Sequence, residues 1–308
     1  MQKILVVHYS QTGQLTSIVD SILGPLASAK AIRIDTLALR PKPAYPFPWT
    51  TQTFCDVFPE SVEGVPCALE PLEIDPEARF DLIVLAYTVW YLAPSLPVQA
   101  FLRSPEAARL FPGTPVVTVI GCRNMWLLAQ EQVKQRLYEL DARHVGNIVL
   151  GDRAGNLTGV ATIAYWMLTG RKDRLLGVFP KPGVDEEDIR RAARFGILLR
   201  KALAEDITAL DQEALNAVGA CPVEPAYILF EHRIRRVFRI WARFIRKKGG
   251  PGAPERQPRV LAFFFYLLAA VAVLAPLASL AAKVSLRIGK ARIEKAVAYY
   301  RSNRYQPE

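Results

Sequence analysis

Residues 8–23, HYSQTGQLTSIVDSIL, decide the fold, because they carry the chain from a buried strand through a short polar loop into a helix. The β-branched run that precedes them predicts a strand over residues 3–8. Apolar residues then recur at helical spacing, which predicts an amphipathic helix over residues 15–26. The polar loop is therefore expected at the carboxyl end of the first strand.

Strand and helix patterns alternate through the first half of the chain. Further strands are predicted at 31–39, 81–87, 115–121 and 147–150, and helices at 98–102 and 127–140. Strands that are apolar on both faces and separated by helices predict an α/β fold, with a parallel sheet covered on both sides. An irregular segment rich in proline and aromatic residues, 40–76, interrupts this alternation.

The polar loop is suited to an anion. In an open parallel sheet, ligands bind beyond the carboxyl ends of the strands, and a helix N-terminus favours negative charge there. Ser10, Thr12 and Thr16 add neutral donors, and Gly13 lets the backbone approach an anion closely. The loop lacks the lysine of a triphosphate-binding loop and the G-x-G-x-x-G spacing of a dinucleotide site. A phosphate monoester held by uncharged donors indicates flavin mononucleotide (FMN), and an ordinary polar turn is the alternative.

Two later loops end strands at the same edge of the sheet. The strand at 81–87 leads into TVWYLAPSLP, and the strand at 115–121 leads into CRNMW. A flavin ring needs flat apolar neighbours and backbone donors, so we expect Trp90 or Tyr91 to stack on it and loop 121–124 to wrap its other side. A rim or core role for Trp90 is the alternative. The predicted FMN-binding residues are Ser10, Gln11, Thr12, Gly13, Gln14, Leu15, Thr16, Thr88, Val89, Trp90, Tyr91, Gly121, Cys122, Arg123 and Asn124.

Together the three loops resemble those of flavodoxin-like proteins. YSQTGQLT is similar to the family's phosphate loop, Ser/Thr-x-Thr-Gly-x-Thr, with Leu15 as an additional residue before Thr16. The resemblance implies a five-stranded parallel sheet in the order 2-1-3-4-5, helices on both faces, and bound FMN. At a finer level, HYSQTGQLTSIVDSILGPL and VIGCRNMWLLAQE look like the dialkylresorcinol condensing enzymes, over residues 1–175.

The finer resemblance implies a reaction. In that family a ketosynthase-type partner supplies an alkyl-substituted cyclohexanedione, and the flavin protein is thought to aromatise it by dehydrogenation. The ring would lose a hydride to the flavin and a proton to a nearby base. The predicted catalytic residues are Arg123, which holds the enolate oxygen or the electron-rich edge of the flavin, and Tyr91, which stacks or donates a hydrogen bond. A solvated loop arginine is the alternative for Arg123. The alternatives are a membrane-tethered quinone reductase or electron carrier, and a flavin-free membrane adaptor.

Composition limits the other classes of function. With 51% apolar and 22% charged residues, the chain is globular. Its four cysteines lack C-x-x-C spacing and its three histidines do not cluster with them, so we expect reduced thiols, no disulfide framework and no metal site. Asp152 and Arg153 are interpreted as a plain ion pair. Residues 224–308 carry 17 Lys/Arg against 5 Asp/Glu, whereas the whole chain has a net charge of +10, so the basic charge lies in the tail.

That tail suggests contact with anionic lipid rather than nucleic acid. A helical extension at 176–223 is followed by a basic amphipathic helix at 224–248, whose apolar stripe fits a membrane interface or, alternatively, the flavin domain. A flexible linker is predicted at 249–259 and a basic tail at 283–308. The uncharged segment 260–282 reaches about 34 Å as a helix, which is long enough to span or insert into a bilayer, and a buried oligomerisation helix is the alternative.

The basic flanks of that segment place the flavin domain on the cytoplasmic face of the inner membrane. The expected partners are an alkylated cyclic diketone, the ketosynthase-type enzyme and membrane lipid, with a homodimer left open.

Overall fold

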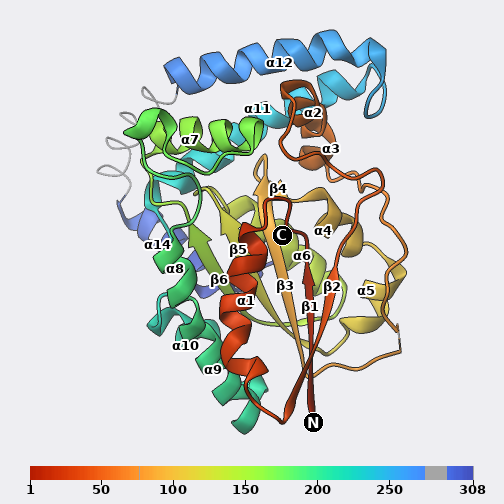
Figure 1. The fold of residues 1–308 in the computed structure, drawn as a ribbon, viewed down its shortest axis with the longest axis vertical. Helices are drawn as coiled ribbons and strands as arrows, with labels where there is room; N and C mark the ends of the chain where they lie inside the picture. Colours follow the sequence, from red (N-terminus) through yellow and green to blue (C-terminus); the bar gives the residue numbers. More distant parts are fainter. Residues whose placement is uncertain (76, 275–289, 308) are drawn as a thin grey trace.

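The computed structural model describes residues 1–75, 77–274 and 290–307 (Figure 1). Five strands form a parallel sheet in the spatial order β2-β1-β3-β5-β6. They are β1 (Gln2–His8), β2 (Ile32–Ala38), β3 (Leu82–Trp90), β5 (Pro115–Cys122) and β6 (Arg143–Gly151). The α/β class predicted from the sequence is confirmed.

The strand order differs from the predicted 2-1-3-4-5 because the sheet contains one more strand. The short β4 (Ala93–Pro94) pairs antiparallel with the end of β3, with Trp90 opposite Ala93. The sequence pattern predicted a strand end at residue 87, but this pairing carries β3 on to Trp90. The added hairpin raises Trp90 above the carboxyl edge of the sheet.

Helices cover both faces of the sheet (Figure 1). One face packs on α1 (Gln14–Ala27), α8 (Glu186–Arg191), α9 (Ala193–Glu205) and α10 (Gln212–Ala217), with η2 (Ile207–Ala209) between the last two. The other packs on α4 (Leu96–Phe101), α5 (Pro105–Leu110), α6 (Leu127–Glu139) and α14 (Lys290–Ser302). The buried sides of β1 alternate, so Ile4 and Val6 face α1 while Leu5 and Val7 face α4 and α6. Within the predicted helical extension 176–223, α8 and α9 are joined at Ala192.

A third layer lies beyond the carboxyl ends of the strands (Figure 1). It consists of α2 (Thr51–Asp56), α3 (Phe58–Glu63), α7 (Asn156–Thr169), α11 (Pro225–Arg246) and α12 (Gln257–Ala269), which we call the cap. Phe58 on α3 stacks on Phe263 of α12 with 3.8 Å between ring centroids, and Phe238 of α11 meets Phe58 edge-on at 5.1 Å. Part of the apolar stripe of α11, including Ala242 and Ile245, is therefore buried within the cap against α3 and α12.

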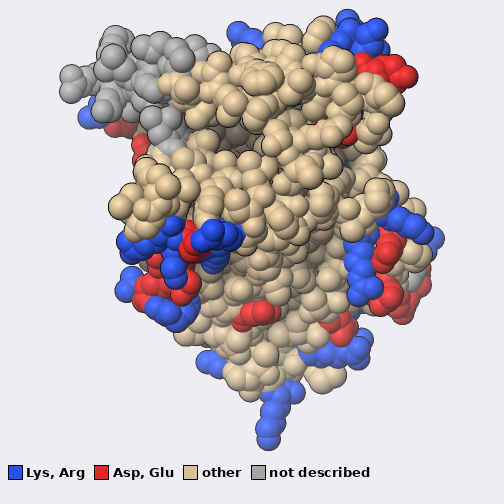
Figure 2. Space-filling view, turned by 45° about the horizontal axis from the view of Figure 1, so that its top comes forward, with Lys and Arg blue, Asp and Glu red and all other residues tan. Residues whose placement is uncertain are grey.

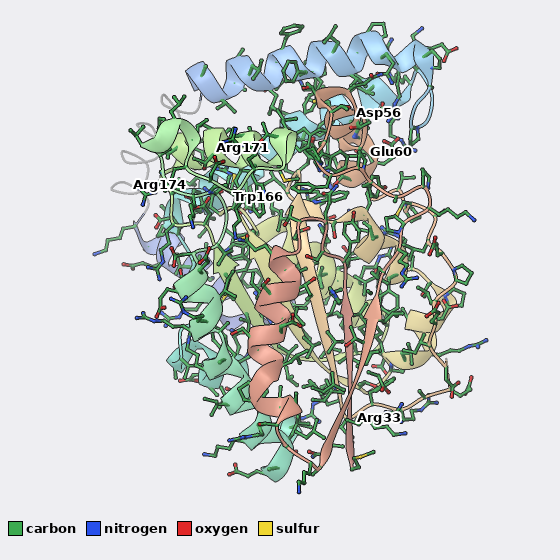
Figure 3. All side chains as sticks on the ribbon, in the orientation of Figure 1. Arg33, Asp56, Glu60, Trp166, Arg171 and Arg174 are labelled. Carbon is green, nitrogen blue, oxygen red and sulfur yellow. The ribbon has the colours of Figure 1, made fainter. Side chains whose placement is uncertain are left out.

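The connection between α11 and α12 is not the flexible linker predicted at 249–259. It contains η3 (Pro254–Arg256), and Arg256 is completely buried. Its guanidinium binds Asp56 at 2.7 Å and Glu60 at 2.9 Å, both from the α2–α3 region. Figure 3 shows the two labelled acids on the helices beneath α12. This buried ion-pair cluster joins α12 to the irregular segment predicted at 40–76.

The predicted hydrophobic segment 260–282 is described only in part. It contains most of α12 and a π-helical turn, η4 (Ala270–Leu274), and residues 275–282 lie outside the described residues. Within the described ranges, no helix combines the length and apolar character that crossing a bilayer requires.

Candidate functional site

The β1–α1 loop, residues 9–13, lies at the carboxyl edge of the sheet and is built from uncharged donors and acceptors (Figure 1). Gly13 precedes the helix with φ of 80°, and a Cβ placed there would meet no atom within 4 Å. The Ser10 hydroxyl accepts a hydrogen bond from the Thr16 amide at 3.2 Å, and the Thr12 hydroxyl accepts a long one of 3.4 Å from the Gln14 amide. The Ser10 and Thr12 hydroxyls thus lie at the first turn of α1 beside an open glycine, and each keeps a proton that a phosphate oxygen can accept.

Two glutamines of the predicted site attach this loop to distant segments. The Gln11 side chain donates to the Pro46 carbonyl at 2.7 Å and accepts from the Trp49 indole at 3.0 Å. The Gln14 amide pairs in both directions with the backbone of Val184, at 3.0 and 3.1 Å. Both side chains therefore position the loop through protein partners.

Close packing explains two further predicted residues. Leu15 is buried against the sheet, and a Cβ on Gly121 of β5 would lie 3.2 Å from its Cδ1. The absence of a side chain at Gly121 lets the first turn of α1 approach the strand. The additional residue in the loop motif, Leu15, is thus a packing anchor, and Thr16 follows it as the residue whose amide returns to Ser10.

An aromatic wall stands next to the loop, formed by Tyr9, Tyr45, Trp49 and Trp90. The half-buried Trp90 meets Tyr45, Trp49 and Tyr9 at centroid distances of 5.2, 5.7 and 5.9 Å. Thr88 and Val89, also predicted, lie just before Trp90 on the same strand. Sequence reasoning missed Tyr45 and Trp49, although YPFPW at 45–49 is an unusually dense aromatic and proline stretch.

Tyr91 lies elsewhere. Its φ of 51° turns the chain at the β3–β4 hairpin, and its hydroxyl donates to the Phe54 carbonyl at 2.6 Å. Its ring contacts Phe58 at 5.0 Å within the cap, and burial raises its pKa well above the ordinary value. In this arrangement the predicted catalytic tyrosine joins the apolar cluster of the cap and not the aromatic wall.

The loop after β5 carries the remaining predicted residues. The Cys122 and Arg123 carbonyls both accept from the Asp152 amide, at 3.1 and 2.9 Å, and the Asn124 side chain donates to the Tyr227 hydroxyl at 3.0 Å. Burial lowers the pKa of Arg123 and raises that of Cys122, so the thiol stays protonated at neutral pH. Arg123 is thus a half-buried cation beside the carboxyl edge of the sheet.

Asp152 and Arg153 do not form the predicted ion pair with each other. The Asp152 carboxylate accepts from the Ala154 amide at 2.7 Å and the Gly183 amide at 3.2 Å, whereas Arg153 binds Asp188 of α8. A Cβ on Gly183 would lie 2.6 Å from the Gln14 side chain, so this position is restricted to glycine. Asp152 therefore links the end of β6 to the segment that holds Gln14.

Glu231 of α11 is a residue that the sequence analysis missed. It is fully buried, and its carboxylate accepts from the amides of Leu127 and Leu128 at 3.1 and 2.7 Å, at the N-terminus of α6. Desolvation raises its pKa to about 7. The sequence could have marked Glu231, because it is the only acidic residue between 225 and 254. Glu231 fixes the point at which the loop after β5 enters α6.

These features fit FMN in two respects. The β1–α1 loop supplies neutral donors for a phosphate monoester, and the aromatic wall bonded to it supplies apolar contacts for a ring. Two surface cavities of about 390 and 480 Å³ lie elsewhere, one beside α4 and one beside α6 and β6, and neither is lined by the β1–α1 loop. All four cysteines are free.

Comparisons with known proteins find only remote structural matches. No family model and no curated protein matches the chain. Among solved structures, an archaeal flavodoxin has 12% identity and a TM-score of 0.37, covering 66% of this chain and 100% of that chain. A putative flavoprotein from Bacteroides eggerthii has 15% identity and a TM-score of 0.39, covering 56% and 100%.

A flavoprotein in complex with FMN from Lactobacillus acidophilus has 15% identity and a TM-score of 0.33, covering 49% of this chain and 91% of that chain. Likeness at this level carries no argument about chemistry. The functional argument depends on the strand topology, the β1–α1 loop and the aromatic wall.

Proposed function

We propose that the protein is an FMN-dependent oxidoreductase. The observation that carries the proposal is the direct bond between the two halves of the site. The Trp49 indole in the aromatic wall donates to Gln11 in the uncharged loop at the switch edge of a parallel sheet. Such an arrangement suits a single ligand that carries both a phosphate group and an apolar ring.

The division of roles follows from the chemistry of each residue. The Ser10 and Thr12 hydroxyls and the amides of the first turn of α1 would hold the phosphate. The aromatic wall would cover the ring and exclude water from it. When bound, FMN supplies a two-electron acceptor. The cap lies over this edge (Figure 1), which suits an enzyme with a small-molecule substrate better than a carrier that presents its flavin to a partner protein.

The substrate proposed is an alkyl-substituted cyclohexanedione, dehydrogenated to an aromatic ring. A partly desolvated cation favours the enolate form of such a diketone, and the half-buried Arg123 is a cation at this edge. The two loops whose sequences resemble those of the dialkylresorcinol condensing enzymes both lie at this edge of the sheet. We further propose that a ketosynthase-type enzyme supplies the diketone and that the protein acts at the cytoplasmic face of the inner membrane.

The phosphate half of the site is tested with two ligands. We expect mass spectrometry of the cofactor extracted from purified protein to identify FMN. The Ser10→Ala/Thr12→Ala variant should then bind FMN about 10- to 100-fold more weakly, because two hydrogen bonds to a charged group are lost. It should bind riboflavin, which lacks the phosphate, as tightly as the unmodified protein. Ser28→Ala, at the other end of α1, is the matched control. Extracted FAD, no flavin, or equal losses for both ligands would refute the proposal.

The redox half is tested under anaerobic conditions. A dialkyl-cyclohexanedione should bleach the bound flavin, and NAD(P)H should not. The Arg123→Gln variant should slow this reduction while FMN affinity is kept. Rapid bleaching by NAD(P)H alone would instead identify a reductase.

A further inference from the structure

The outer face of α12 is entirely apolar. Leu261, Phe265 and Leu268 are 55%, 59% and 51% exposed, at helical spacing. All the exposed positions between 258 and 272 are apolar: Pro258, Leu261, Ala262, Phe265, Leu268, Ala269 and Ala272. Solvent-facing helix surfaces are ordinarily polar, so this face requires an explanation.

The opposite face of the same helix is firmly held. Val260 and Phe263 are buried in the cluster that joins α3, α11 and α12, and Arg256 is fixed by its ion pairs at the start of the helix. The exposed side chains therefore do not result from a loosely placed helix. They form a fixed surface on the outside of the cap.

Charge indicates what this surface meets. From 225 to 272, the exposed charged positions are basic except for Glu255. The exposed basic residues are Arg233, Arg236, Arg239, Arg243, Arg246, Lys247 and Lys248. Figure 2 shows the uncharged surface over the top of the molecule, with Lys and Arg at its edge. An apolar face without hydrogen-bonding side chains, next to basic residues, matches an anionic lipid interface.

We propose that the outer face of α12, centred on Leu261, Phe265 and Leu268, docks on an anionic lipid bilayer. The cap lies beyond the carboxyl ends of the strands, so docking would bring the candidate site near the lipid (Figure 1). Alkylated rings partition into a bilayer about fourfold more strongly for each added methylene, so a lipid-facing site would meet a concentrated substrate. This purpose rests on the proposed function, whereas the docking itself does not.

The experiment is co-sedimentation of the full chain with vesicles of phosphatidylcholine, with and without phosphatidylglycerol. Leu261→Glu/Phe265→Glu should weaken binding at least about 30-fold, because two half-exposed apolar side chains no longer enter the lipid. The matched control is Tyr138→Glu/Ile197→Glu, in which apolar residues 62% and 54% exposed outside the cap are changed in the same way. The control should bind like the unmodified protein. Removing phosphatidylglycerol should weaken binding roughly fivefold for each basic residue that reaches the surface.

Equal binding by the α12 variant and the unmodified protein would overturn the proposal. The proposal would also be overturned if the unmodified protein were a dimer and the α12 variant a monomer that still binds vesicles. A second copy of the chain would then cover the outer face of α12. Circular dichroism of both variants checks that they fold. Vesicle binding by a protein that holds no flavin would support the docking surface and refute only the enzymatic proposal.

Discussion

Replacing Arg256 with methionine should loosen the packing of α12 on α2 and α3 within the cap. The Arg256 side chain is fully buried, and it donates to Asp56 at 2.7 Å and to both Glu60 oxygens at 2.9 and 3.2 Å, besides the Asp56 and Gly249 carbonyls. Methionine would leave two carboxylates largely out of water, with Arg246 only 3.6 Å from Glu60 as partial compensation. Breaking a buried pair from one side costs about 3–5 kcal/mol, and we expect a loss of that size.

The assay combines chemical denaturation with hydrogen exchange of peptides from α2, α3 and α12. Exchange should accelerate in these peptides and stay slow in β1, because the sheet has its own core. Arg243→Met is the matched control, since that arginine is 68% exposed and 3.6 Å from Glu63, and an exposed pair contributes about 1 kcal/mol or less. Adding Asp56→Asn and Glu60→Gln to Arg256→Met should recover most of the loss. Equal costs for the Arg256 and Arg243 variants would refute the reasoning.

Three further predictions concern single positions. Desolvation raises the folded-state pKa of Glu231 from 4.5 to about 7, so its contribution to stability is complete below about pH 4.5 and is lost as pH rises through 7. Denaturation of Glu231→Gln and the unmodified protein at pH 4.5 and 8 should show a relative gain for the variant of about 3 kcal/mol, and parallel pH profiles would contradict this. Gly196→Ala should cost several kcal/mol or prevent folding, because its Cβ would lie 1.8 Å from the Ile22 carbonyl, whereas Ile197→Ala on the exposed side should be nearly neutral. Trp49→Phe should weaken FMN binding by about fivefold, because the hydrogen bond to Gln11 is lost. Equal FMN affinity of the variant and the unmodified protein in a fluorescence titration would show that this bond does not contribute to binding.

The elements of the sheet could be predicted because their signals are local. An apolar run marks β1, and spacing of three and four residues marks α1, whose buried residues are the six that the pattern selected. The pattern could not show β4, because a two-residue strand has no periodicity and exists only through pairing with β3. Nor could it show that the predicted linker 249–259 is held at Arg256, because the acids that bind Arg256 lie about 200 positions away in the sequence.

The candidate site divides in the same way. The β1–α1 loop was predicted from its own composition and position at a strand end. The partners of Gln11 and Gln14, the aromatic wall and the role of Glu231 depend on segments 35 to 170 residues distant, which no local pattern encodes. Tyr91 illustrates the limit, because one backbone angle at a hairpin directs its side chain into the cap.

Residues that follow the last strand in the sequence complete the candidate site at the carboxyl edge of the sheet. The backbone of Val184 bonds to Gln14 in the first turn of α1, and Glu231 accepts from the first amides of α6. During synthesis, every strand of the sheet will therefore have emerged long before either contact can form. A protein truncated after residue 175 would lack both of these contacts as well as α8, α9 and α10, which cover one face of the sheet, so a complete cofactor site requires the last third of the polypeptide.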